Sequence, residues 1–117
     1  MSTVQPPNAI DEVFERLRQT GETALMPFMT MGDPDLETSV ELIAAAEAAG
    51  VHMIEMGVPY SDPLADGPVI QRASERALQH RVSLTDCIEL GSKARSRGVK
   101  MPFIIFTYYN PALQLGL

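Results

Sequence analysis

Cysteine and histidine are scarce in this chain of 117 residues, and both shortages limit the sites it can form. The one cysteine, Cys87, cannot form a disulfide within the chain, which favours a reducing compartment. His52 and His80 are the only histidines, so no Cys/His cluster has the spacing of a metal site. We therefore treat these three residues as structural or surface positions and expect no bound metal.

Basic residues and long apolar runs are also in short supply. Nine basic residues stand against fifteen acidic ones, a formal net charge of −6, whereas nucleic-acid-binding proteins carry a clustered basic face. No apolar run approaches the ~20 residues that span a bilayer, and the N-terminal segment lacks the basic and apolar regions of a signal peptide. We therefore expect a cytoplasmic protein that binds neither nucleic acid nor membranes.

Apolar segments alternate with segments of helical periodicity along the chain. Nearly continuous apolar runs, typical of strands covered on both faces, predict strands over 24–31, 51–58 and 101–109. Pro27 is expected to interrupt the first of these ladders, and Asn110-Pro111 to end the third in a turn. Apolar periodicity predicts a helix from an N-cap at Asn8 up to Gly21 and further helices over 36–49 and about 68–80. Another begins at Ser83, where residues 83–86 resemble a capping box, and ends near residue 98. This alternation predicts parallel βαβ units and an α/β fold.

Catalytic groups in parallel α/β folds gather at the C-terminal ends of strands, because the loops there vary while the sheet holds them rigidly. That rule selects residues 32–33, 55–66 and 108–110. Side chains alternate in direction along a strand, so one of Tyr108 and Tyr109 should face the mouth of the sheet and the other the helices. Packing would explain either tyrosine, and likewise Phe28, without a ligand.

Glu55 is the most informative residue, because it lies within the apolar second strand segment. Burial raises the pKa of a carboxyl group and suits it to proton exchange near neutral pH. Two structural explanations stay open: Glu55 pairs with an Arg or Lys, or its strand lies at a sheet edge and faces water. Asp62 and Asp66 follow in a proline-rich loop and could share the same pocket, although turn formation or helix capping also explains each of them.

Two segments resemble the tryptophan synthase alpha chain family. They read PFMTMGDP over 27–34 and IEMGVPYSDPLADGP over 54–68, and the second is long and specific. The similarity continues through residues 69–71 and through Tyr108 and Asn110, so it covers nearly all of the chain from near Ile10 onward.

The resemblance implies a parallel (β/α)8 TIM barrel, of which residues 1–117 form a single partial domain with roughly the first three βα units. The implied enzyme is a carbon-carbon lyase of tryptophan biosynthesis that cleaves indole-3-glycerol phosphate to indole and glyceraldehyde 3-phosphate, without a cofactor in this chain. Glu55 would be its general acid/base. Asp66 would accept a hydrogen bond from the indole N–H and stabilise the cationic intermediate.

By the same resemblance, Phe28, Phe106 and Tyr108 would line the indole pocket. Pro59, Asp62 and Asn110 would face a partner, the tryptophan synthase beta chain, which carries pyridoxal phosphate. The implied assembly is an α2β2 heterotetramer.

The length leaves a second hypothesis open. A complete barrel takes ~250 residues, and its phosphate site is normally built from the loops after strands seven and eight. We therefore expect the 117-residue chain to be inactive on its own. The alternative to the lyase is a catalytically incompetent barrel fragment that acts only as a folding or beta-chain-binding module. Another phosphate-binding barrel enzyme is a third and weaker hypothesis.

Overall fold

Three short parallel strands lie at the centre of the structure, a computed structural model that describes residues 5–116. The strands are β1 (Phe28–Thr30), β2 (Ile54–Gly57) and β3 (Phe103–Phe106), and β2 lies between the other two. The helices of this part of the chain are α1 (Ala9–Thr20), α2 (Leu36–Ala48), α3 (Pro68–Leu78), α4 (Leu84–Ser96) and α5 (Tyr109–Leu115). The parallel pairing with helical connections confirms the predicted α/β class.

The helices begin where side chains satisfy their free backbone N–H groups. Asn8 and Ser83 each form a capping box, with Asp11 and Asp86 respectively, which confirms the predicted N-cap at Asn8 and the predicted box at Ser83. The Asp35 carboxylate accepts the Thr38 N–H at 2.7 Å and caps α2. Local sequence therefore sets these three helix starts.

The strands are shorter than predicted. Pro27 has no N–H to donate, so β1 begins only at Phe28, although the Pro27 carbonyl still accepts the Glu55 N–H at 3.0 Å. The predicted turn at Asn110-Pro111 is wrong, because both residues lie in the first turn of α5. Proline is tolerated there, since its N–H would have no partner within the helix.

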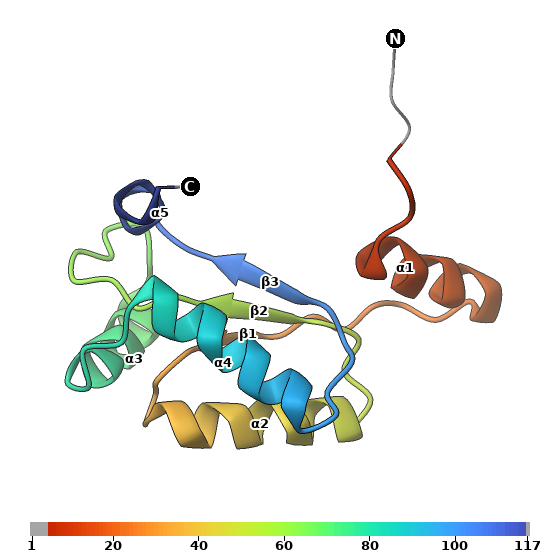
Figure 1. Ribbon diagram of the computed structural model, residues 1–117, viewed down its shortest axis with the longest axis horizontal. Helices are drawn as coiled ribbons and strands as arrows, with labels where there is room; N and C mark the ends of the chain where they lie inside the picture. Colours follow the sequence, from red (N-terminus) through yellow and green to blue (C-terminus); the bar gives the residue numbers. More distant parts are fainter. Residues whose placement is uncertain (1–4, 117) are drawn as a thin grey trace, which may run out of the picture.

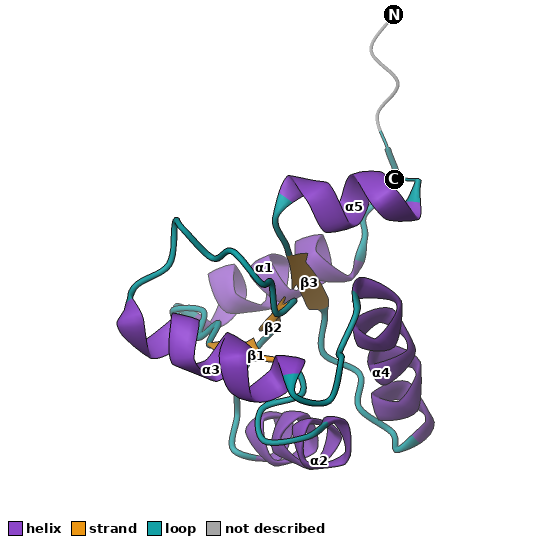
Figure 2. Ribbon diagram, turned by 90° about the vertical axis from the view of Figure 1, so that its left-hand side faces the viewer, coloured by secondary structure: helices purple, strands orange, loops and turns teal. Residues whose placement is uncertain are grey.

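The register of the sheet separates its two faces. Phe28, Glu55 and Ile104 lie side by side across the three strands, so their side chains share one face together with Phe106. We call this the inner face and the opposite one the outer face. Figure 2 shows α3, α2 and α4 in an arc around the strands.

The main core fills the space between the outer face and the helices. Ile54 and Met56 of β2 are almost completely buried there, and α2 packs against α4 beneath them. The inner face is not covered in the same way, since the Phe106 side chain is 50% exposed. The prediction that the strands are covered on both faces is therefore wrong within residues 5–116. The remaining members of this core are Met31, Val40, Ile43, Val58, Val82, Leu84, Cys87, Leu90, Ala94, Val99 and Met101.

A smaller apolar cluster closes the N-terminal end of the strands. Val13 and Leu17 of α1 pack with Met53, and Ile104 of the inner face packs against this cluster. Figure 1 accordingly shows α1 beside the beginnings of the strands and α5 beyond their arrowheads. The C-terminal end of the inner face, where Phe106 is half-exposed, lies away from this cluster. No helix within residues 5–116 has the length and apolar character needed to cross a membrane.

Gly57 allows the Phe28 ring to lie over it on the inner face. A Cβ atom at position 57 would collide with Cζ of Phe28 and would lie 2.7 Å from its Cε2 and 3.1 Å from the Met29 carbonyl oxygen. The Phe28 ring in turn contacts the Phe106 ring edge to face, with centroids 5.6 Å apart. The missing side chain therefore shapes the apolar surface beside Glu55.

We expect Gly57→Ala to destabilise the chain by about 1–3 kcal/mol, because the ring and the backbone must both move. Urea unfolding followed by circular dichroism measures the change. The matched control is Gly91→Ala in α4, where the nearest atom is Phe103 Cδ2 at 3.5 Å. That variant should be stabilised by up to about 1 kcal/mol through helix propensity. Equal stability of the two variants would contradict the packing described for Phe28.

Cys87 gives a second test of the core. Its side chain is 0% exposed. Burial, with a smaller effect from the Asp86 charge, raises the pKa of the Cys87 thiol from 9.0 to about 12. The thiolate fraction of the folded chain near pH 8 is then about 1,000-fold below that of an ordinary thiol.

We therefore expect a disulfide reagent such as DTNB to label Cys87 at pH 8 at least 1,000 times more slowly in the folded than in the urea-unfolded chain. The raised pKa contributes stability that is intact below pH 9 and is lost as the pH rises toward 12. Rapid labelling of the folded chain would show that α4 does not pack on the sheet as described.

Candidate active site

Glu55 lies in the middle of the central strand and points to the inner face. Because β2 has a neighbour on each side, the alternative that Glu55 lies in an edge strand is wrong. Within residues 5–116 no side chain forms an ion pair or hydrogen bond with its carboxylate, so the ion-pair alternative is also without support. The side chain is half-buried beside the aromatic pair of Phe28 and Phe106. Glu55 is thus an unpaired carboxylate on a partly apolar surface.

Asp66 reaches the same edge of the sheet from the loop after β2. The Tyr108 hydroxyl donates a hydrogen bond to Asp66 Oδ2 at 3.0 Å, and it accepts the Ala65 N–H at the same distance. Burial, reinforced by the Asp66 carboxylate, raises the pKa of Tyr108. Tyr108 therefore remains a protonated donor at neutral pH and holds two consecutive loop residues.

Further contacts fix this loop from both sides. Tyr60 stacks on Tyr108 with ring centroids 4.9 Å apart, and the Asn110 amide donates to the Tyr60 hydroxyl at 3.0 Å. From α3, the Gln71 amide donates to the carbonyls of Pro63 and Asp66 at 3.3 and 2.9 Å. Sequence reasoning did not single out Tyr60 or Gln71 for any role, although both lie within the specific motif or its continuation.

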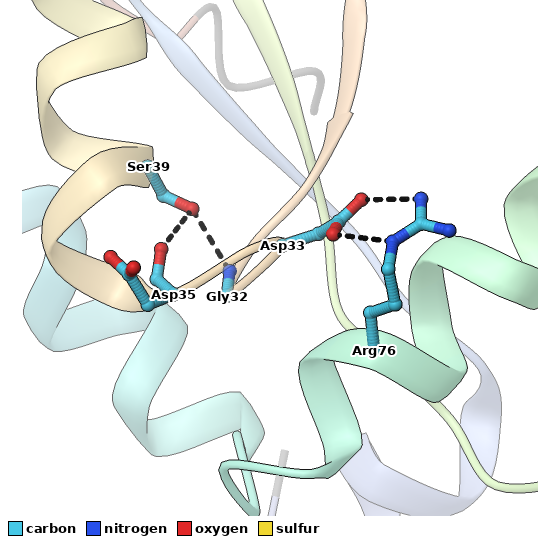
Figure 3. A network of polar contacts seen from close by, with 5 residues as sticks. All are labelled: Gly32, Asp33, Asp35, Ser39 and Arg76. Carbon is cyan, nitrogen blue, oxygen red and sulfur yellow. Dashed lines mark hydrogen bonds and ion pairs between the residues drawn. The ribbon is translucent and has the colours of Figure 1, made fainter.

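The loop after β1 is held independently (Figure 3). Arg76 of α3 donates two hydrogen bonds to the Asp33 carboxylate, at 2.8 and 2.9 Å, and this pairing raises the pKa of Arg76. The Gly32 N–H donates to Ser39 Oγ at 2.9 Å, and Ser39 Oγ donates to the Asp35 carbonyl. The first two loops at this edge are therefore both tied to helices.

The structure brings some predicted residues together and leaves others apart. Glu55, Phe28 and Phe106 share the inner face, and Asp66 meets Tyr108. Asp62 does not join them: its side chain is exposed and has no hydrogen-bond partner in the part of the chain that the structure describes. Tyr109 begins α5 and is 72% exposed rather than packed on the helices, because β3 ends before it.

Pro59 and Asn110, the other predicted partner-facing residues, differ in exposure. Pro59 is buried, whereas Asn110 is exposed at the start of α5.

Across residues 5–116, no three His, Cys, Asp or Glu side chains gather in a group that could hold a metal ion. A groove of about 1190 Å³ lies between α1 and the N-terminal ends of the strands, and none of the predicted site residues lines it.

Curated relatives with this sequence pattern are tryptophan synthase alpha chains. The Bacillus pumilus alpha chain is 59% identical over 97 residues, which are 83% of this chain and 36% of the relative. The Chloroflexus aggregans alpha chain is 51% identical over 110 residues, which are 94% of this chain and 41% of the relative. The chain thus spans about two fifths of the length of these relatives.

Solved structures agree with the sequences. Tryptophan synthase subunit alpha from Legionella pneumophila superposes with a TM-score of 0.91 at 39% identity, over 95% of this chain and 42% of that one. The fold is that of the parallel (β/α)8 barrel, of which this chain covers roughly the first three βα units. The family model of the tryptophan synthase alpha chain matches residues 14–117. The chain therefore belongs to the tryptophan synthase alpha chain family.

Proposed function

We propose that residues 1–117 are one partial domain, the N-terminal part of a (β/α)8 barrel lyase that cleaves indole-3-glycerol phosphate to indole and glyceraldehyde 3-phosphate. The observation that carries this proposal is the unpaired Glu55 carboxylate on the inner face, beside an aromatic surface, with the hydrogen-bonded Asp66 carboxylate in the loop that follows the same strand. The substrate is inferred from membership of the family. The geometry supports proton transfer by Glu55 and stabilisation of a cation by Asp66.

Glu55 would move both protons of a retro-aldol cleavage. Delivery of a proton to the indole carbon that bears the glycerol chain creates a cationic indoleninium. Removal of the glycerol hydroxyl proton then lets the carbon-carbon bond break, because the oxygen lone pair forms the aldehyde while the bond pair neutralises the cation. A half-buried carboxylate without an ion-pair partner is suited to exchange these protons.

Asp66 would accept the indole N–H and stabilise the cation. A carboxylate whose hydrogen bonds are already in place does this with little reorganisation during the reaction. The rings of Phe28, Phe106 and Tyr108 would line the indole pocket. The edge-to-face pair of phenylalanines offers the apolar surface that a planar indole requires.

Partner binding is the remaining part of the proposal. Asp62 and Asn110 are exposed near the C-terminal edge of the sheet, and Pro59 is buried at the start of the loop that contains Asp62. These residues would face the tryptophan synthase beta chain in a cytoplasmic α2β2 heterotetramer. The beta chain would carry pyridoxal phosphate and consume the indole, and no cofactor is assigned to this chain.

The Glu55 assignment is tested in a complete enzyme, defined as residues 1–117 followed by the remaining part of the Bacillus pumilus alpha chain. We expect Glu55→Gln to lower the rate of indole formation by about 10²–10⁴-fold, because the amide keeps the shape but cannot exchange the protons. Glu41→Gln, on the exposed side of α2, is the matched control and should keep full activity. Near-normal turnover of Glu55→Gln would overturn the assignment.

We also expect the 117-residue chain alone to produce no indole from indole-3-glycerol phosphate. A barrel of this type holds its phosphate with loops after strands seven and eight. The exposed Phe106 and the free edge of β3 within residues 5–116 favour pairing with a complementary chain instead. Steady turnover by the purified chain, free of full-length enzyme, would contradict this expectation.

A further inference from the structure

We propose that the Tyr108 hydroxyl is a positioning group for Asp66: it holds the carboxylate through Oδ2 and directs Oδ1 to the indole N–H. This inference rests on the proposed function. It gives Tyr108 a role that differs from lining the pocket, because the hydroxyl would act through Asp66 and not on the substrate.

The hydrogen bonds of Tyr108 leave it no proton for a ligand. A tyrosine hydroxyl has one proton to donate, and that of Tyr108 goes to Asp66 Oδ2. The same oxygen accepts a hydrogen bond from the Ala65 N–H. The Tyr108 hydroxyl therefore binds both the Asp66 side chain and the backbone of the residue before it. A single hydroxyl thereby sets the position of the loop and the rotation of the Asp66 carboxylate.

Tyr108 is itself held in place. It is the N-cap residue of α5, two residues after the end of β3, and its ring stacks on Tyr60. On the other side of the loop, Gln71 donates to the Asp66 carbonyl at 2.9 Å. The Asp66 backbone is therefore fixed from α3 and its carboxylate from the end of β3. Rotation of the carboxylate away from the site would break the Tyr108 hydrogen bond.

The free oxygen of Asp66 gives this arrangement its chemical use. An ionised carboxylate offers about four acceptor positions on two oxygens. Within residues 5–116 no group donates to Oδ1. An indole N–H can therefore bind Oδ1 without displacing Tyr108, and the positive charge that develops on the indole meets a carboxylate already oriented for it.

A double-mutant cycle in the complete enzyme tests the inference. We expect Tyr108→Phe to lower kcat about tenfold with little change in KM, because the ring remains and only the hydrogen bond to a charged group is lost. Asp66→Asn should cost more, and the double variant should be no slower than Asp66→Asn, since Tyr108 acts only through Asp66. Tyr109→Phe is the matched control, because that neighbouring tyrosine is 72% exposed.

The contrary outcomes separate the two proposals. If Tyr108→Phe equals Tyr109→Phe in kcat, or if the effects of Tyr108→Phe and Asp66→Asn are additive, the positioning role is wrong while the lyase assignment stands. If the wild-type complete enzyme produces no indole, the proposed function fails and this inference fails with it.

A spectroscopic titration reports the contact itself. The difference in absorbance at 295 nm between the wild type and Tyr108→Phe follows the ionisation of Tyr108 with pH. We expect Asp66→Asn to lower the pKa of Tyr108, because a neutral amide no longer opposes formation of the phenolate. An unchanged titration would overturn the proposed contact whatever the activity of the variants.

Discussion

The parallel register of β1, β2 and β3 is the constraint on which the rest of the structure depends. Strand side chains alternate between faces, so the pairing of Phe28 with Glu55 and of Glu55 with Ile104 sends all three away from α2 and α4. The intervening residues then supply the core against α2 and α4. A shift of one residue would bury Glu55 under the helices and expose Met56. The hydrophobic demand for Ile54 and Met56 in the core therefore also fixes the carboxylate in the site.

Loops complete the site because helices and strand ends hold them. Tyr108 and Asp66 are 42 residues apart in the chain, and no local pattern predicts that they meet. Only the β2–β3 pairing brings them to one edge. Asp62 carries the same local turn signals as Asp66, yet its side chain is exposed and lacks that contact. The sequence could thus nominate both aspartates, whereas the three-dimensional pairing distinguishes them.

The fold was more predictable than the site. Helix starts at Asn8 and Ser83 depend on residues three positions apart, so the sequence is sufficient to locate them. Strand lengths depend on hydrogen bonds to distant partners, and the apolar runs over 24–31 and 101–109 therefore overstated them. The sequence could not predict whether Glu55 lies in an edge strand or a central strand, because the two kinds of strand have similar sequences.

In the proposed lyase, the inner face and the loop of Asp66 together form one indole site. A crystal structure of the complete enzyme with indole-3-propyl phosphate, which lacks the glycerol hydroxyls and cannot be cleaved, tests this most directly. We expect the indole ring to lie against Phe28 and Phe106, its N–H to donate to Asp66 Oδ1, and the Glu55 carboxylate to face the propyl chain. An indole ring bound elsewhere, or an N–H without contact to Asp66, would contradict it.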